Sequence, residues 1–241
     1  MYNYDFTELS GTENDLTWGL TKVVLRVNSK LQDIPMGKAL SGILTQIVNL
    51  LTAYDFNALA EWNNIPGFVS VKKVKTMQSV VKELPSNSEI VELGCYKGRS
   101  AVALASVLPE DGVLHCIDHF VGSPTMPELG IDDRNLLTEF RKNVAAFGVD
   151  DKIKVLEMKS AEAVPRFEPE SIDAIFIDAA HDYESVKEDL LSWYPKVKPG
   201  GFIFCDDYEP SWPGVVQAVK DVGLEGVVAA PNLWMHQKAE K

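Results

Sequence analysis

The segment that decides the fold is Val91-Glu92-Leu93-Gly94-Cys95-Tyr96-Lys97-Gly98-Arg99-Ser100. It continues an apolar run that starts at residue 89, and such a run, stopped by a glycine, predicts a short buried strand. The residues that follow, Ser100–Val107, have the pattern of a helix. The segment is therefore predicted to form a strand, a tight turn and a helix in succession.

Two glycines shape the predicted turn. Gly94 and Gly98 let the backbone turn tightly and let a ligand approach it closely. The spacing differs from the G-x-G-x-x-G fingerprint of nicotinamide-binding domains, because Tyr96 stands at the middle position. A nicotinamide-dependent dehydrogenase is therefore disfavoured, whereas another nucleoside-containing cofactor remains compatible with the turn.

The rest of the chain alternates apolar runs with helical patterns. After the first run, Glu89–Leu93, four main runs and two weaker ones follow, at Val113–Ile117, Ile153–Glu157, Ile172–Ile177, Gly201–Cys205, 226–229 and 233–236. Further helical patterns cover 133–147, 183–194 and 215–222. Nearly continuous apolar strands are typical of parallel sheets that are covered on both faces. We therefore predict an α/β domain over residues 85–241, with a doubly wound, Rossmann-like, seven-stranded and mostly parallel sheet.

Residues 1–84 have a different pattern. Leu40–Leu51 and Val71–Leu84 both place apolar residues at helical spacing, and Pro85 follows the second of them. We predict that residues 1–84 form a helical extension that acts as a lid and contributes specificity. The loop Phe120–Asp132, which contains glycines and prolines, is expected to be another part of that cover.

Composition restricts the class of protein. The 241 residues carry a formal net charge of −12, which disfavours nucleic acid as a partner unless a local basic groove overrides it. The apolar stretches are far shorter than the roughly 20 residues that span a bilayer, and no secretory signal is visible. The three cysteines lie in or beside apolar runs, which indicates buried reduced thiols. We therefore expect a cytoplasmic protein without a membrane partner.

Small or acidic residues follow four of the five main runs, namely Gly94, Asp118, Asp178 and Asp206. The carboxyl ends of parallel strands meet at one edge of the sheet, where ligands bind in folds of this class. Asp118 lies 24 residues after Gly94, a spacing at which its carboxylate can accept hydrogen bonds from both hydroxyls of a ribose. The alternative is that these acids only cap the helices that follow them.

The strongest chemical signal is a set of three carboxylates. Asp178 ends one run, and Asp206 with Asp207 ends the next, so that neighbouring strands would bring all three to one corner. Three carboxylates in one place repel one another unless a cation joins them. Hard oxygen ligands favour Mg²⁺, with Mn²⁺ or Ca²⁺ as other candidates. The alternative is that Asp206 and Asp207 cap the next helix and that Asp178 is solvated.

The segment Glu92–Ser100 resembles the cofactor motif of class I S-adenosylmethionine-dependent methyltransferases. It is particularly similar to the catechol O-methyltransferases, which share its Glu-Leu-Gly-x-Tyr-x-Gly-x-Ser skeleton. Asp206-Asp207-Tyr208, with Trp212-Pro213-Gly214, is similar to the macrocin-type sugar O-methyltransferases. Both families place metal ligands at the spacing seen here, which strengthens the interpretation of Asp178, Asp206 and Asp207 as ligands of Mg²⁺ or Mn²⁺.

The resemblance also implies which residues surround S-adenosylmethionine. Its ribose would bind Asp118, and Asp178 would lie beside the cofactor as well as the metal. The residues predicted to surround the methionine part are Glu92, Gly94, Tyr96, Gly98 and Ser100. The residues predicted to lie near the adenine are Ser160 and Ala161.

His181 lies three residues after Asp178, at the offset where the catechol enzymes carry their catalytic lysine. A histidine can accept a proton at neutral pH, and we predict that His181 removes the hydroxyl proton of the acceptor. The alternative is that His181 caps the helix that starts near residue 183 or bonds Asp182. Trp212 and Tyr208 either line the acceptor pocket or belong to the core.

The sequence thus predicts a metal-dependent O-methyltransferase that uses S-adenosylmethionine. Its acceptor would be a hydroxyl of a small molecule, either a sugar or a catechol-like vicinal diol. Two alternatives remain open: a metal-independent N- or C-methyltransferase in which the acids are scaffolding, and a methyltransferase fold that only binds ligands. Assembly into a homo-oligomer is compatible with the sequence.

Overall fold

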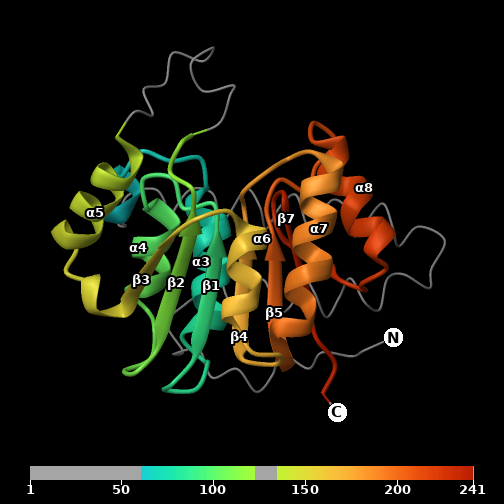
Figure 1. Ribbon diagram of the computed structural model, residues 1–241, viewed down its shortest axis with the longest axis horizontal. Helices are drawn as coiled ribbons and strands as arrows, with labels where there is room; N and C mark the ends of the chain where they lie inside the picture. The colour runs from blue at the N-terminus through green and yellow to red at the C-terminus, as the bar shows by residue number, and fades with distance from the viewer. Residues whose placement is uncertain (1–60, 123–134, 241) are drawn as a thin grey trace, which may run out of the picture. The chain divides into compact units, whose positions relative to one another are not determined.

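The computed structural model describes residues 61–122 and 135–240. These residues contain a seven-stranded sheet with the strand order β3-β2-β1-β4-β5-β7-β6 (Figure 1). The strands are β1 (Glu89–Leu93), β2 (Val113–Asp118), β3 (Ile153–Glu157), β4 (Ile172–Ile177), β5 (Val197–Cys205), β6 (Val227–Ala230) and β7 (Leu233–Gln237). The first five strands pair in parallel, and β7 and β6 add antiparallel pairs at one end. The predicted doubly wound, mostly parallel sheet is confirmed.

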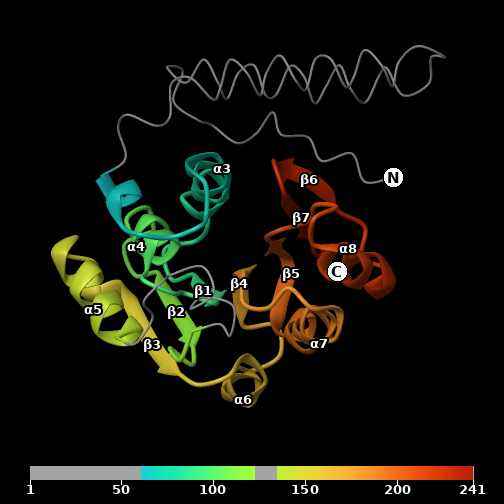
Figure 2. The ribbon, with the colours of Figure 1, turned by 90° about the horizontal axis from the view of Figure 1, so that it is seen from above.

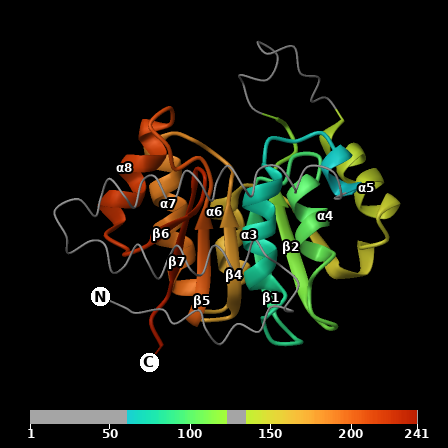
Figure 3. The same ribbon diagram turned by 180° about the vertical axis from the view of Figure 1, so that it is seen from behind.

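Helices cover both faces of the sheet. They are α3 (Val71–Val81), α4 (Arg99–Ala105), α5 (Leu136–Ala146), α6 (Ser160–Ala163), α7 (Tyr183–Trp193) and α8 (Pro213–Val222). Seen from above, α3, α4 and α5 lie on one face, and α6, α7 and α8 lie on the other (Figure 2). The view from behind shows α3 and α4 in front of the central strands (Figure 3). Because both faces are covered, all six residues of β4 are buried, which explains their nearly continuous apolar run.

The register of the central strands brings their carboxyl ends together. Leu93 of β1 pairs with Ile177 of β4, and Ile177 pairs with Cys205 of β5. Backbone hydrogen bonds continue the pairing by one residue, since the Asp178 amide donates to Leu93 at 2.9 Å and the Asp206 amide donates to Ile177 at 2.9 Å. Strand register alone therefore places the acids of the two strands beside the glycine turn.

Strand β5 differs from the prediction at its start. The sequence predicted the strand at Gly201–Cys205, yet it already begins at Val197, which pairs with Ile172. The register then shifts before Ala174, which pairs with Phe202, and Gly200 has a φ of +79°. Gly200 and Gly201 therefore lie at an irregularity inside the strand and not before it.

Helix α3 packs against α4 and β6 within the unit that spans residues 61–241. The helical pattern at 40–51 and most of the loop 120–132 lie outside the described residues, so the lid remains a prediction. Within residues 61–122 and 135–240, no helix combines the length and the hydropathy that crossing a bilayer requires.

Candidate active site

The glycine turn is pressed against the end of β4. Gly94 has a φ of +81° and Gly98 a φ of +88°, and Tyr96 between them also has a positive φ of +47°. A Cβ atom on Gly94 would lie 2.1 Å from the carbonyl oxygen of Asp178. Glycine is therefore required at position 94 both for its conformation and for the close approach of two backbones.

Asp118 organises this turn. Its Oδ2 accepts hydrogen bonds from the amides of Cys95 and Tyr96, at 2.9 and 3.0 Å, and its Oδ1 accepts one from the amide of Phe120 at 2.7 Å. The carboxylate therefore ties the end of β2 to the turn after β1. His119 is half exposed and accepts a hydrogen bond from the Val121 amide at 3.0 Å, as expected of a loop residue.

Glu92 is a fully buried acid beneath the turn. Burial raises its pKa to about 8, although contacts with the side chains of Ser100 and Cys116 oppose the shift. Among the described residues, its Oε1 has no hydrogen-bond partner. A buried acceptor without a donor is unfavourable, and a positively charged or hydrogen-bonding ligand group would relieve it.

Ser160 begins α6, directly after β3, where the adenine contact was predicted. Its hydroxyl donates to Asp189 and accepts a hydrogen bond from the Trp193 indole at 2.8 Å. Both partners belong to α7, so this hydroxyl joins two helices. Burial raises the pKa of Asp189 to about 6, and the contact with Ser160 opposes that shift. Ala161 is exposed at the start of the same helix.

The ends of β4 and β5 form an acidic corner. Ligand atoms of Asp178, His181 and Asp207 all lie within 4.8 Å of one another. Nε2 of His181 lies 2.9 Å from Oδ2 of Asp207. Helix α7 is capped by Asp182, whose carboxylate accepts a hydrogen bond from the Ser185 amide at 3.0 Å. Asp182 therefore caps α7, and the side chain of His181 faces Asp178 and Asp207.

Asp206, the third predicted ligand, is buried and paired with a lysine from a distant part of the chain. Its Oδ1 is bound by the ammonium of Lys73 on α3 and also accepts a hydrogen bond from the Asp207 amide at 2.8 Å. The same ammonium lies 3.6 Å from Oδ1 of Asp207. Neither acid caps the next helix, since the N-cap residue of α8 is Trp212 and no side chain caps that helix.

Burial and the neighbouring charges shift the pKa values of Asp178 and Asp207 in opposite directions. Burial, followed by the charges of Asp206 and Asp207, raises the pKa of Asp178 well above its usual range. Burial would also raise the pKa of Asp207, but the hydrogen bond from His181 and the charge of Lys73 outweigh it, so this pKa is lowered. The raised pKa of Asp178 shows that ionising all three acids together is unfavourable, and a cation at the corner would relieve that repulsion.

The ring of Trp212 stacks on His181, with centroids 4.2 Å apart and an angle of 25° between the planes. Trp212 is 40% exposed, so it forms a wall beside the histidine and is not a core residue. Tyr208 is instead partly buried and packs against the hydrophobic core. Gly214 permits this arrangement, because a Cβ there would lie 2.7 Å from the carbonyl oxygen of His181.

Other predictions concern residues outside the corner. Cys95, Cys116 and Cys205 are buried free thiols, as expected.

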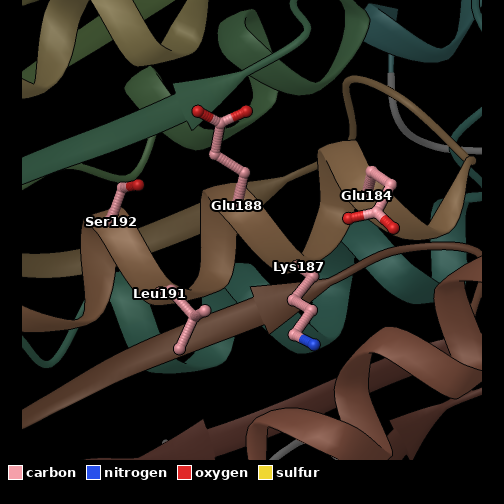
Figure 4. Close-up of a pocket in the computed structure, with 5 residues that line it drawn as sticks. All are labelled: Glu184, Lys187, Glu188, Leu191 and Ser192. Carbon is pink, nitrogen blue, oxygen red and sulfur yellow. The ribbon is translucent and has the colours of Figure 1, made fainter.

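A shallow depression of about 400 Å³ on α7 is lined by Glu184, Lys187, Glu188, Leu191 and Ser192 (Figure 4). All five side chains extend from one helix, and none of them belongs to the turn or the acidic corner.

The geometry of turn and corner agrees with comparisons to known proteins. Residues 91–208 match a family model described as a methyltransferase domain. The chain carries a methyltransferase domain. The matched segment begins in β1 and ends just beyond the aspartate pair, so this domain includes the turn, Asp118, and Asp178, His181, Asp206 and Asp207 of the acidic corner.

Named relatives are O-methyltransferases. The chain is 23% identical over 166 residues to demethyldecarbamoylnovobiocin O-methyltransferase of Streptomyces niveus, which covers 60% of this chain and 63% of the relative. It is 30% identical over 156 residues to caffeoyl-CoA O-methyltransferase of Medicago sativa, which covers 62% and 56% respectively. The methyltransferase domain thus spans less than two thirds of these curated relatives.

A solved structure shares the fold. The O-methyltransferase TomG of Streptomyces achromogenes, in complex with S-adenosylmethionine, matches with a TM-score of 0.54 and 18% identity. The match covers 72% of this chain and 82% of TomG. The Rossmann-like class I methyltransferase fold predicted from the sequence is thereby confirmed.

Proposed function

We propose that this protein is an S-adenosylmethionine-dependent O-methyltransferase that acts on a small molecule and uses a divalent cation. The observation that carries the proposal is the position of the acidic corner. The side chain of Asp178 belongs to the corner, and the backbone carbonyl of the same residue lies against Gly94 of the turn. A methyl donor at the turn and a cation at the corner would therefore be neighbours.

The turn fits the cofactor. The donor supplies a methyl group that is already activated by its sulfonium charge, and the protein holds it in place. Glu92 offers the partnerless Oε1 to the ammonium of the methionine part. Asp118 anchors the turn and, by our prediction, also accepts hydrogen bonds from the ribose. The positive-φ backbone at Gly94 and Gly98 leaves room for close approach.

The corner fits a hard divalent cation. Asp178 and Asp207 supply carboxylate oxygens, which Mg²⁺ and Mn²⁺ prefer. Such an ion would orient two vicinal oxygens of the acceptor and favour loss of a proton from one of them. Asp206 remains a predicted ligand, although Lys73 and the Asp207 amide occupy its Oδ1.

His181 is positioned to take the proton of the acceptor. Since Nε2 faces Asp207, the hydrogen on Nε2 is directed to that carboxylate, which leaves Nδ1 as the proton acceptor. As the new O–C bond forms, the C–S bond breaks with its electron pair going to sulfur, and the hydroxyl proton moves to Nδ1. Trp212 restricts the imidazole by stacking on its face.

The test uses release of S-adenosylhomocysteine with a panel of catechols and sugars that carry vicinal hydroxyls. We expect turnover with Mg²⁺ or Mn²⁺ and its loss on addition of EDTA. Asp178→Asn should nearly abolish turnover and leave S-adenosylmethionine affinity, measured by calorimetry, close to that of the wild type. Glu188→Gln on the outer face of α7 is the matched control and should behave as the wild type.

Two results would count against the proposal. Full turnover in EDTA would favour the second candidate, a metal-independent N- or C-methyltransferase, for which the Lys73 ammonium among the acids is the specific support. Binding of the cofactor without turnover on any acceptor would favour a binding module. The cytoplasmic location and any homo-oligomer remain predictions.

A further inference from the structure

Lys73 is an unexpected member of the acidic corner. It lies on α3, whose buried side is otherwise largely apolar, with Val74 and Met77 among its neighbours. The side chain of Lys73 is 9% exposed, and its ammonium reaches Asp206 and Asp207. Burying an ammonium is unfavourable unless opposite charges compensate it, so the position of this lysine depends on the acids.

The contacts divide the corner into two halves. On one side, Lys73 and the Asp207 amide both bind Oδ1 of Asp206. On the other side, Oδ2 of Asp207 faces His181, and Asp178 lies within reach of both. The lysine therefore occupies one carboxylate of the corner, and the other two remain for a cation.

Charge leads to the same division. When a cation holds all three carboxylates ionised, these acids and the Lys73 ammonium together carry an excess of two negative charges. One divalent cation would balance that excess. The ammonium would also repel such a cation, because it lies only 3.6 Å from Oδ1 of Asp207, a carboxylate that the cation would share.

We propose that Lys73 is a built-in counter-ion of the acidic corner, which occupies Asp206 and weakens the binding of a divalent cation at Asp178 and Asp207. The proposal rests on the proposed function, since it concerns the same metal. The proposal has two consequences. In the absence of metal, Lys73 stabilises the folded protein by compensating the acids of the corner. Removal of the ammonium frees Asp206 as a ligand and abolishes the repulsion of the cation, so metal binding becomes tighter.

The experiment compares the full-length wild type with Lys73→Met, Lys73→Gln and Lys73→Arg. Binding of Mn²⁺ is followed by the electron paramagnetic resonance of the free ion, and the melting temperature is measured with and without Mn²⁺. We expect the Met and Gln variants to bind Mn²⁺ at least about tenfold more tightly than the wild type. They should melt at lower temperature without metal and gain more from Mn²⁺. The Arg variant should bind Mn²⁺ as the wild type does.

Lys82→Met, at the exposed end of the same helix, controls for the loss of one charge and should match the wild type. If Lys73→Met does not fold, Lys73→Gln decides, because its amide keeps a polar group beside the acids without the charge that repels a cation. Equal or weaker Mn²⁺ binding in both neutral variants would overturn the proposal. Metal binding by the neutral variants but not by the wild type would support it while removing metal dependence from the proposed function.

Discussion

The buried acid beneath the glycine turn makes the stability of this protein depend on pH. Burial raises the pKa of Glu92 from an ordinary value of 4.5 to about 8, so the carboxyl stays protonated in the folded state where it ionises in the unfolded chain. Between these two pKa values the unfolded state binds fewer protons, and stability therefore falls as the pH rises. Below pH 4.5 the contribution of Glu92 is constant, and above pH 8 its cost is complete.

The magnitude follows from the two pKa values. At about 1.4 kcal/mol per pH unit, the full cost of Glu92 amounts to about 5 kcal/mol of unfolding free energy. Glu92→Gln removes the titration and keeps the shape of the side chain. We therefore expect the stability of the variant, relative to the wild type, to increase by about 1.4 kcal/mol per pH unit from pH 5 to pH 8.

The assay is urea unfolding of both ligand-free proteins at half-unit steps between pH 5 and pH 8.5. Taking the difference between the two curves cancels the titration of all other acids. Glu83→Gln, at an exposed site, is the control and should give a curve parallel to that of the wild type. If the Glu92→Gln and wild-type curves also run parallel, Glu92 ionises normally in the fold and the argument from burial is wrong.

Three further predictions concern the turn and the base. Gly94→Ala should cost about 2–4 kcal/mol of stability in urea unfolding, because its Cβ would meet the Asp178 carbonyl, whereas Gly148→Ala, at a φ of +64° with open space around it, should cost only about 1–2 kcal/mol. Equal losses would show that the close approach is unimportant. Asp118→Ala should weaken S-adenosylmethionine binding by about 1.5–3 kcal/mol in calorimetry, and an unchanged affinity would contradict the ribose contact. His181→Ala should lower kcat by about 10²–10⁴ across pH 6–9, and a rate within threefold of the wild type would make it a bystander.

Much of the sheet could be predicted from the sequence alone. The strands at Ile153–Glu157 and Ile172–Ile177 were predicted with their observed bounds. For Ile172–Ile177 the reason is that a strand buried on both faces needs apolar residues throughout. The sequence also predicted that β4 and β5 are adjacent strands, since right-handed crossovers leave few arrangements for alternating strands and helices. That neighbourhood was enough to bring Asp178 and Asp207 to one edge.

The local sequence pattern could not predict which groups each polar side chain contacts. The sequence left open whether His181 caps α7, and the structure gives that cap to Asp182 and turns His181 to Asp207. It predicted Ser160 near the adenine, which stays a prediction, whereas the structure shows that the hydroxyl of this residue links α6 and α7. Side-chain partners of this kind depend on elements that are distant in sequence.

Lys73 shows most clearly that contacts between elements distant in sequence could not be predicted. The helical spacing of α3 placed it four residues before Met77, next to the apolar face, which was the only local sign that this lysine is buried. Its partners, Asp206 and Asp207, are separated from it in the sequence by five strands, β1 to β5. The sequence by itself determined the alternation of strands and helices and the acids at the strand ends, because hydrophobic periodicity is local. Only the tertiary structure decided which cation those acids already hold, because electrostatic pairing acts between groups that folding alone brings together.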